Sequence, residues 1–178
     1  MAGHSSRPWG WYRLERSWAE RLVADAGVRG GDLVLDIGAG DGALTGPLLA
    51  AGARVVAIEL HPGRRAALRA RFPAADLVVV AADAADLRLP RRPFRVVANP
   101  PWAVTAPLVA RLLGRGSRLV RADLLLKRPA VRRCLDDPRY AGGWELRAGL
   151  TVPRRAFRPA PPIDARVLVV ERRVNRRA

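Results

Sequence analysis

Residues 33–45 read Leu-Val-Leu-Asp-Ile-Gly-Ala-Gly-Asp-Gly-Ala-Leu-Thr, an apolar run that passes into a glycine-rich turn. The run at 33–37 is too short for a helix and rich in branched apolar residues, which is typical of a buried parallel strand. The glycines let the backbone approach a ligand closely, and helix-forming residues follow them. A strand, a glycine turn and a helix in this order predict one unit of an α/β sheet with a ligand at the turn.

The alternation of apolar runs and helix-forming stretches continues along the chain. Further strands are predicted at residues 55–60, 77–80, 95–98, 119–126, 144–152 and 165–171. Helices are predicted at residues 43–51, 63–71 and 107–113. Because strands that alternate with helices are joined by right-handed crossovers, we predict an α/β fold with a doubly wound, mostly parallel sheet. The last two strands could form an antiparallel hairpin at the sheet edge.

Three segments lie outside this alternation. Residues 7–27 carry apolar side chains at helical spacing, among them Trp11, Leu14 and Trp18, and predict an amphipathic leading helix. The segment 153–164 contains four prolines, so we expect an irregular, ordered loop that contacts substrate. The arginines of residues 172–178 form a basic tail. The length of 178 residues predicts a single domain, residues 1–178.

The charge balance indicates a polyanionic partner. The chain has 32 basic and 16 acidic residues, a net charge of +16, and Lys127 is its only lysine. Guanidinium groups match the geometry of phosphates, so nucleic acid is favoured. An arginine-rich proteome would also produce this surplus, and an anionic membrane is the weaker alternative because no long amphipathic helix with a basic face stands out.

Cysteine content and hydropathy exclude several classes of protein. Cys134 is the only cysteine, which excludes a disulfide framework and a zinc-binding thiolate cluster, so no metal site is expected. The sequence has no leader peptide with a basic start, and no apolar run has the length that spans a bilayer. We therefore expect a cytoplasmic monomer that does not bind a membrane.

Polar residues follow the predicted strands at the ends where α/β sheets bind ligands. The spacing Gly38-x-Gly40-x-Gly42 differs from the dinucleotide pattern and favours a nucleoside cofactor, although a tight turn alone would also use these glycines. Glu59 could accept hydrogen bonds from two ribose hydroxyls, or it could be a solvated loop carboxylate. Asp83 could accept a hydrogen bond from the amine of an adenine, or it could cap a helix.

The stretch Asn99-Pro100-Pro101-Trp102 carries the most chemical information. Two successive prolines remove two donors and fix the backbone, leaving carbonyl acceptors in a rigid turn. The amide oxygen of Asn99 and the carbonyl of Pro100 could both accept from one NH2 group, and Trp102 could stack on the base that carries it. The alternative is a turn that ends a strand and places a tryptophan in the core.

These stretches together resemble the family of rRNA adenine N6-methyltransferases, which includes the macrolide-resistance (Erm) enzymes and the ribosome-maturation dimethyltransferases (KsgA-like). The resemblance spans most of positions 33 to 170 and rests on residues 36–45, 55–60, 83–84, 99–102 and 153–164. It implies a class I (Rossmann-like) methyltransferase sheet, S-adenosylmethionine as cofactor and ribosomal RNA as partner.

The resemblance also implies which residues bind the cofactor. Gly38 and Gly40 would line its methionine side, Glu59 would contact its ribose, and Asp83 with Ala84 would contact its adenine. Asn99 would be shared between the cofactor and the target.

The implied catalytic residues are Asn99, Pro100, Trp102 and Phe157. Phe157 would face Trp102 across the target adenine, which must be extruded if it lies inside a helix. The family's Gln-Asn-Phe-Leu motif over the methionine end of the cofactor is replaced here by residues 11–14.

Within that replaced motif, Tyr12 and Leu14 take the cofactor-binding positions, and only Leu14 matches plainly. Arg13 or Arg16 could pair with the cofactor carboxylate. The family usually carries a helical domain after the catalytic one, whereas this chain stops at Ala178, so we expect RNA docking to rest on the arginines of the catalytic domain.

The expected function is N6-methylation of an adenine in 23S rRNA before full ribosome assembly, conferring macrolide-type antibiotic resistance. The alternatives are a 16S rRNA dimethyltransferase of ribosome maturation and a non-catalytic RNA-binding assembly factor. Methyltransferases acting on adenine in DNA or on a glutamine side chain of protein share the Asn-Pro-Pro-aromatic turn. The loop around Phe157 and the high charge favour RNA.

Overall fold

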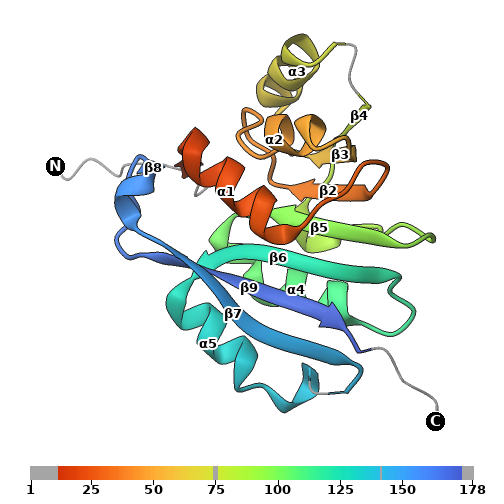
Figure 1. Ribbon diagram of the computed structural model, residues 1–178, viewed down its shortest axis with the longest axis vertical. Coiled ribbons are helices and arrows are strands. Elements are labelled where there is room, and N and C mark those ends of the chain that lie inside the picture. Colours follow the sequence, from red (N-terminus) through yellow and green to blue (C-terminus); the bar gives the residue numbers. More distant parts are fainter. Residues whose placement is uncertain (1–11, 74–75, 141, 174–178) are drawn as a thin grey trace, which may run out of the picture.

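The computed structural model describes residues 12–73, 76–140 and 142–173, and their centre is a seven-stranded sheet (Figure 1). The strand order is β4-β3-β2-β5-β6-β9-β7. In chain order the strands are β2 (Leu33–Ile37), β3 (Arg54–Ile58), β4 (Leu77–Val80), β5 (Phe94–Ala98), β6 (Leu119–Lys127), β7 (Trp144–Val152) and β9 (Ala165–Arg172).

Strand directions confirm the predicted sheet. Strands β4, β3, β2, β5 and β6 pair in parallel, and β9 is antiparallel to both β6 and β7. Strand β9 therefore runs opposite to the other six strands of this sheet, and it forms the edge hairpin with β7. The predicted strand ends agree with the observed ones to within two residues, because short apolar runs between turn signals leave little freedom of length.

The described helices cover both faces of the sheet (Figure 1). They are α1 (Arg16–Ala26), α2 (Thr45–Ala50), α3 (Pro62–Arg71), α4 (Thr105–Leu113) and α5 (Arg128–Leu135). Short 3-10 turns add η1 (Ala84–Asp86), η2 (Trp102–Val104), η3 (Pro138–Tyr140) and η4 (Arg154–Ala156). Helix α5 was not predicted, because it has eight residues and its few buried side chains, Ala130, Val131 and Cys134, alternate with arginines.

Two apolar clusters lie on opposite faces of the sheet. Alternate residues along each strand point to opposite faces, and Leu35 belongs to one cluster while Val34 belongs to the other. The first cluster packs α4 and α5 against the sheet, and the second packs α1 and α2. This two-sided burial explains why the central strands are apolar throughout rather than alternating.

The predicted leading helix at 7–27 is wrong in its first part. Helix α1 begins at Arg16, and Arg13–Leu14 form strand β1, while residues 7–11 lie outside the described residues. The predicted irregular loop 153–164 is also wrong in part, because it contains η4 and strand β8 (Phe157–Arg158). Strands β1 and β8 pair antiparallel, Leu14 opposite Phe157, so each segment supplies the partner that the other lacks alone.

The basic tail predicted at 172–178 begins within regular structure. Arg172 ends β9, and its guanidinium donates hydrogen bonds to the carbonyls of Leu119 and Ser117. Residues 174–178 lie outside the described part of the chain.

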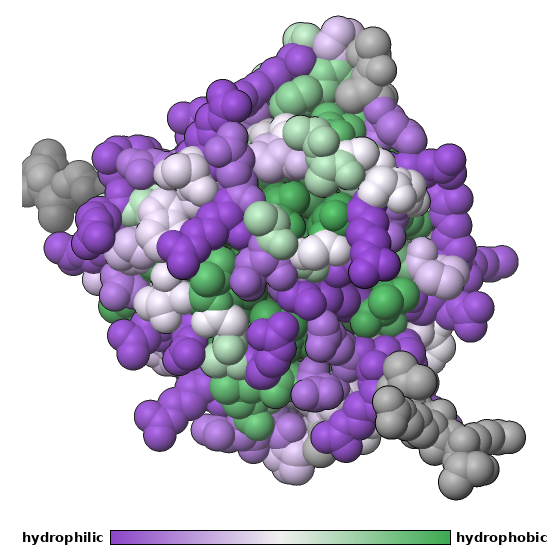
Figure 2. All heavy atoms as spheres, viewed as in Figure 1, coloured by the Kyte–Doolittle hydropathy of each residue, from purple (hydrophilic) through white to green (hydrophobic). Residues whose placement is uncertain are grey.

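Hydrophilic side chains dominate the face shown in Figure 2, with apolar side chains visible between them. Within the described ranges, every helix falls short of the apolar length needed to cross a bilayer.

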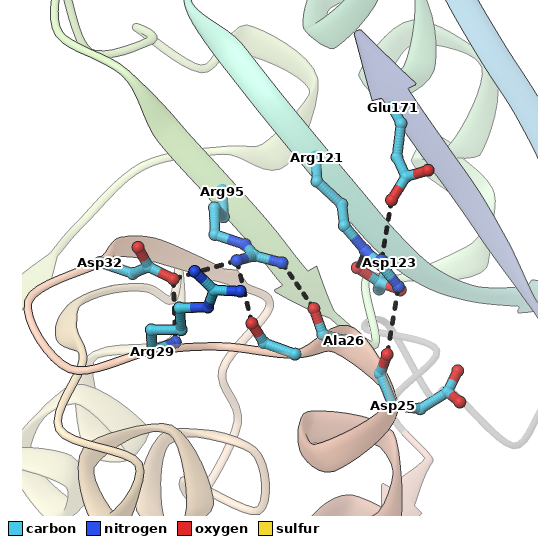
Figure 3. Close-up of polar contacts among 9 residues, drawn as sticks. Asp25, Ala26, Arg29, Asp32, Arg95, Arg121, Asp123 and Glu171 are labelled. Atoms are coloured by element: carbon cyan, nitrogen blue, oxygen red, sulfur yellow. Dashed lines mark hydrogen bonds and ion pairs between the residues drawn. The ribbon is translucent and has the colours of Figure 1, made fainter.

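Two arginines from neighbouring strands hold the carboxyl end of α1 (Figure 3). Arg95 on β5 donates to the carbonyls of Ala26 and Gly27, and Arg121 on β6 donates to the carbonyl of Asp25 at 3.2 Å. The last carbonyls of a helix have no partner within the helix, and its dipole places partial negative charge there. Both guanidiniums therefore satisfy these carbonyls and fix α1 to the sheet.

Arg121 is itself held by carboxylates. Its Nε and Nη2 donate to the two oxygens of Asp123 at 2.8 Å each, and its Nη1 donates to Glu171 at 2.8 Å. Asp123 is fully buried. The side-chain hydrogen bond with Asp123 raises the pKa of Arg121, so this guanidinium stays charged.

We predict that Asp123→Asn lowers the free energy of unfolding by about 3 kcal/mol, because it breaks a buried bidentate ion pair and leaves Arg121 undercompensated. Urea unfolding measures the change. Asp86→Asn serves as control, since the Asp86 side chain is 90% exposed in its pair with Arg111 and its loss should change little. Equal effects of the two substitutions would contradict the role given to Asp123.

Candidate active site

The candidate site lies at the carboxyl ends of β2 and β5, where the strand order of the sheet reverses direction. Connections from β2 lead to one side of the sheet and connections from β5 to the other, which opens a crevice between these two strand ends. The glycine turn follows β2 and the Asn99-Pro100-Pro101 turn follows β5. The fold thus brings together two motifs that are about sixty residues apart in the chain.

Gly38 is where the two turns touch. Its φ of +76° lies in the left-handed region, and a Cβ built there would lie 2.9 Å from Cδ of Pro101 and 3.3 Å from Cα of Pro100. Both the conformation and the space therefore require glycine. The backbone of the glycine turn is packed directly against the proline turn.

The Glu59 carboxylate closes the glycine turn from the side of β3. It is 5% exposed, and its two oxygens accept hydrogen bonds from the backbone N–H of Gly40 at 2.9 Å and of His61 at 2.8 Å. Arg64 lies 3.9 Å away. A carboxylate has about four lone-pair directions, and two are used here, so Glu59 can still accept hydrogen bonds from two hydroxyl groups. Its geometry excludes the solvated loop carboxylate and fits a ribose.

Asp36 lies beneath the same turn. It is 1% exposed, and its Oδ2 accepts a hydrogen bond from Thr45 Oγ1 at 2.7 Å. The pKa of Asp36 is raised to about 7, mainly by burial; hydrogen bonding with Thr45 opposes the rise, and the nearby charge of Glu59 adds to it. The sequence predicted no role for this side chain. A carboxyl that titrates near neutrality thus lines the floor of the site.

Asp83 caps the 3-10 turn η1, as the structural alternative predicted. Its Oδ1 accepts from the backbone N–H of Ala85 at 2.8 Å. The exposed carboxylate also lines a hollow of about 460 Å³ together with Val80 and Leu87. Capping fixes the carboxylate at the mouth of an apolar space, a geometry that fits an adenine whose amine lies at the rim.

Asn99 is oriented by the amino-terminal segment. Its Nδ2 donates to the backbone carbonyl of Tyr12 at 2.8 Å, which leaves Oδ1 as the acceptor of the side chain. The side chain therefore presents an oxygen, as the proposed role of an amine acceptor requires.

The amino-terminal segment also closes over the glycine turn. Arg13 pairs with Asp41 at 2.5 Å, Leu14 is 2% exposed, and the space between this segment and the turn is about 10 Å³. That is room for about one water. Arg13 and Arg16, either of which could pair with a cofactor carboxylate, pair in this structure with Asp41 and Glu20.

The aromatic side chains of the site pack against one another and leave no space for a base between them. The ring of Trp102 lies 5.0 Å from that of Tyr12 and 6.5 Å, edge to face, from that of Phe157. Trp102 is 9% exposed and Phe157 is fully buried. The rings touch, so a base enters between Trp102 and Phe157 only when they separate, and the stacking role of both stays a prediction.

Two features of this cluster were missed by the sequence analysis. The ammonium of Lys127 lies 5.4 Å from the centre of the Trp102 ring, a cation–π contact. The indole Nε1 of Trp102 is buried without a hydrogen-bond partner among the described residues. The position of Lys127 at the carboxyl end of a strand next to β5 was the available signal for the first.

Comparison with known proteins identifies relatives of this architecture. Residues 12–177 match the family model described as ribosomal RNA adenine dimethylase. The chain is 36% identical over 176 residues to a ribosomal RNA small subunit methyltransferase A of Thermosynechococcus vestitus, covering 89% of this chain and 65% of that protein. It is 36% identical over 146 residues to the mycinamicin-resistance protein MyrB of Micromonospora griseorubida, covering 79% and 47%.

Solved structures give the same result. The 23S rRNA methyltransferase ErmE superimposes with a TM-score of 0.83 at 26% identity, covering 92% of this chain and 70% of that one. The chain spans less than two thirds of the length of both curated relatives named above.

The buried Asp36 makes a prediction for stability. Between about pH 4 and pH 7 the native carboxyl keeps a proton that the unfolded chain has released, so the free energy of unfolding falls as pH rises. Asp36→Asn removes this titration, and we expect it to gain roughly 2–3 kcal/mol relative to the unsubstituted protein between pH 5 and pH 8. Urea unfolding at both pH values measures this. A stability difference that is independent of pH would contradict it.

Proposed function

The chain belongs to the ribosomal RNA adenine dimethylase family, and from that premise we propose that it methylates the N6 amine of an adenine in ribosomal RNA. The observation that carries the proposal is the contact of the Gly38 turn with the proline turn, beside an Asn99 amide whose oxygen is left as acceptor. A nucleoside site and an amine-accepting site then adjoin at one crevice.

S-adenosylmethionine supplies an electrophilic methyl group when it is bound. The glycine turn at Gly38 and Gly40 would hold its methionine side, Glu59 its ribose, and Asp83 with Ala84 its adenine. The buried carboxylate of Glu59, already oriented by two backbone N–H groups, supports this placement. Because the space beneath Tyr12 and Leu14 is only about 10 Å³, this segment would have to move to admit the methionine end.

Asn99 and Pro100 would act on the target amine. The Asn99 Oδ1 and the Pro100 carbonyl would accept hydrogen bonds from its two N–H groups, which would turn the nitrogen lone pair out of conjugation. As the N–C bond forms and the S–C bond of the sulfonium breaks, the amine would lose one proton to solvent. Neither group is a base of useful strength, so rate enhancement rests on positioning and on electrostatic orientation of the amine. Trp102, with Lys127 against its ring, would hold the extruded base by stacking.

For the target we propose 23S rRNA and a role in macrolide-type resistance. The similarity to MyrB and the superposition on ErmE support this choice. Methylation of 16S rRNA in ribosome maturation is the second candidate, and the identity to small subunit methyltransferase A over 89% of the chain favours it. A non-catalytic assembly factor is disfavoured by the fixed Asn99 amide.

We predict that Asn99→Ala slows single-turnover methyl transfer by about 10²–10³-fold at saturating cofactor and RNA, the usual effect of removing one oriented polar group from a transition state. Quench-flow with labelled cofactor measures the rate. Urea unfolding of the same variant controls for loss of the bond to Tyr12. A rate equal to that of the unsubstituted protein would exclude the amine-orienting role of Asn99.

The choice of RNA has its own test. Mass mapping of rRNA from cells that express the protein should show a new N6-methylated adenine in 23S rRNA that is missing from cells expressing Asn99→Ala. Methylation confined to 16S rRNA would replace the resistance role with the maturation role. Absence of any new methylated adenine would overturn the proposed activity.

A further inference from the structure

A second hollow, distinct from the candidate active site, lies between helix α5, strands β7 and β9 and the loop 153–164. Its volume is about 830 Å³, which is in the range of sites for small ligands and single residues of polymers. Figure 1 shows α5 lying against the β7 and β9 hairpin. Nothing in the methyl-transfer site described above uses it.

The floor of this hollow is apolar. Leu135 on α5 and Ile163 in the loop line it, and they are 39% and 38% exposed. Two large, partly exposed aliphatic side chains that line one concave surface mark a binding surface more often than scattered apolar residues do.

The rim of the hollow is strongly basic. Arg128, Arg132, Arg154 and Arg166 line it, against one acidic residue, Asp164. Oδ1 of Asp164 already accepts the backbone N–H of Arg154 at 2.8 Å.

Three of these arginines have side chains without a partner among the described residues. Within the part of the chain that the structure describes, the side chains of Arg128, Arg132 and Arg154 form no ion pair or hydrogen bond, while Arg166 donates to the carbonyl of Gly149 at 3.3 Å. Elsewhere in the same part, arginines such as Arg95 and Arg121 pair with carboxylates. The rim guanidiniums are therefore available to an external anion, and their forked geometry matches phosphate.

Two of the rim arginines lie close along the chain to residues of the aromatic cluster. Arg128 follows Lys127, whose ammonium contacts Trp102. Arg154 lies in the turn that leads into Phe157, whose ring is edge to face with Trp102. Arg128 and Arg154 thus link the rim to the two segments that carry Lys127 and Phe157.

We propose that this hollow binds a nucleotide adjoining the target adenine in single-stranded RNA, with its base on the floor of Leu135 and Ile163 and its phosphates on the rim arginines. The inference rests on the proposed function in one respect: the strand is the substrate RNA. Aliphatic contact does not distinguish bases, so the site anchors the strand more than it reads the sequence.

Charge removal tests the rim. Arg132→Gln with Arg154→Gln should weaken binding of a fluorescent single-stranded RNA about tenfold and reduce the slope of log K against log salt by about 1.4, since a single strand loses about 0.7 per phosphate contact. The matched control is Arg91→Gln with Arg92→Gln, two exposed arginines just before the amino end of β5. Equal losses in both double variants would overturn the proposal.

Crosslinking tests the floor. The same RNA carrying 4-thiouridine beside its adenine should crosslink to peptides that contain α5 or residues 162–163, and Leu135→Ser with Ile163→Ser should reduce the yield several-fold. Crosslinks confined to other peptides would overturn the site. The site would also be overturned if α5 were needed for binding a ribosomal protein and not for binding RNA.

Parallel assays separate this inference from the proposed function. Calorimetry with S-adenosylmethionine should give the same affinity for the rim variant as for the unsubstituted protein, because the rim lies outside the cofactor residues. Loss of RNA binding in the rim variant with no methylation by the unsubstituted protein would uphold the hollow and reject the methyltransferase. Methylation with unchanged RNA binding in the rim variant would reject only the hollow.

Discussion

The close packing of the Gly38 turn against Pro100 and Pro101 is the constraint on which the site depends. No side chain fits between the two backbones, and the left-handed φ of Gly38 disfavours one in any case. Gly40 and Glu59, which we propose hold the cofactor, are thereby positioned relative to Asn99 by main-chain packing rather than by flexible side chains. Positioning of this kind is what a transfer reaction without a strong base requires.

The amino-terminal segment extends this constraint across the molecule. At one end the Tyr12 carbonyl accepts from Asn99 and Leu14 pairs with Phe157. At the other end, the carboxyl terminus of α1 is held by Arg95 and Arg121 (Figure 3). The segment before α1 thus contacts the site, while the last turn of α1 is held by arginines of β5 and β6. If the segment at Tyr12 moved to open the site, these arginines would still hold the other end of the helix.

The sequence predicted the sheet well because its strands are buried on both faces and bounded by turns. It predicted the glycine turn, Glu59 and Asn99 as neighbours because parallel strands end at the same edge. Strands β1 and β8 could not be predicted, since each is two residues long and exists only through a partner far away in the chain. The pairing of Arg13 with Asp41 and the contact of Tyr12 with Trp102 are also tertiary contacts between distant residues, which the local sequence pattern does not predict.

The net charge of +16 divides into two populations once the arginines are placed. Some, such as Arg95 and Arg121, hold elements together by pairing with carboxylates and by donating hydrogen bonds to the last carbonyls of α1. Others, such as Arg128, Arg132 and Arg154 at the rim of the hollow by α5, have no partner among the described residues, and Arg154 lies in the same loop as Phe157, whose ring contacts Trp102 edge to face. On the function proposed above, an anion at Arg154 and a base at Trp102 would both contact the loop 153–164, so docking of the strand would be coupled to the opening of the aromatic cluster.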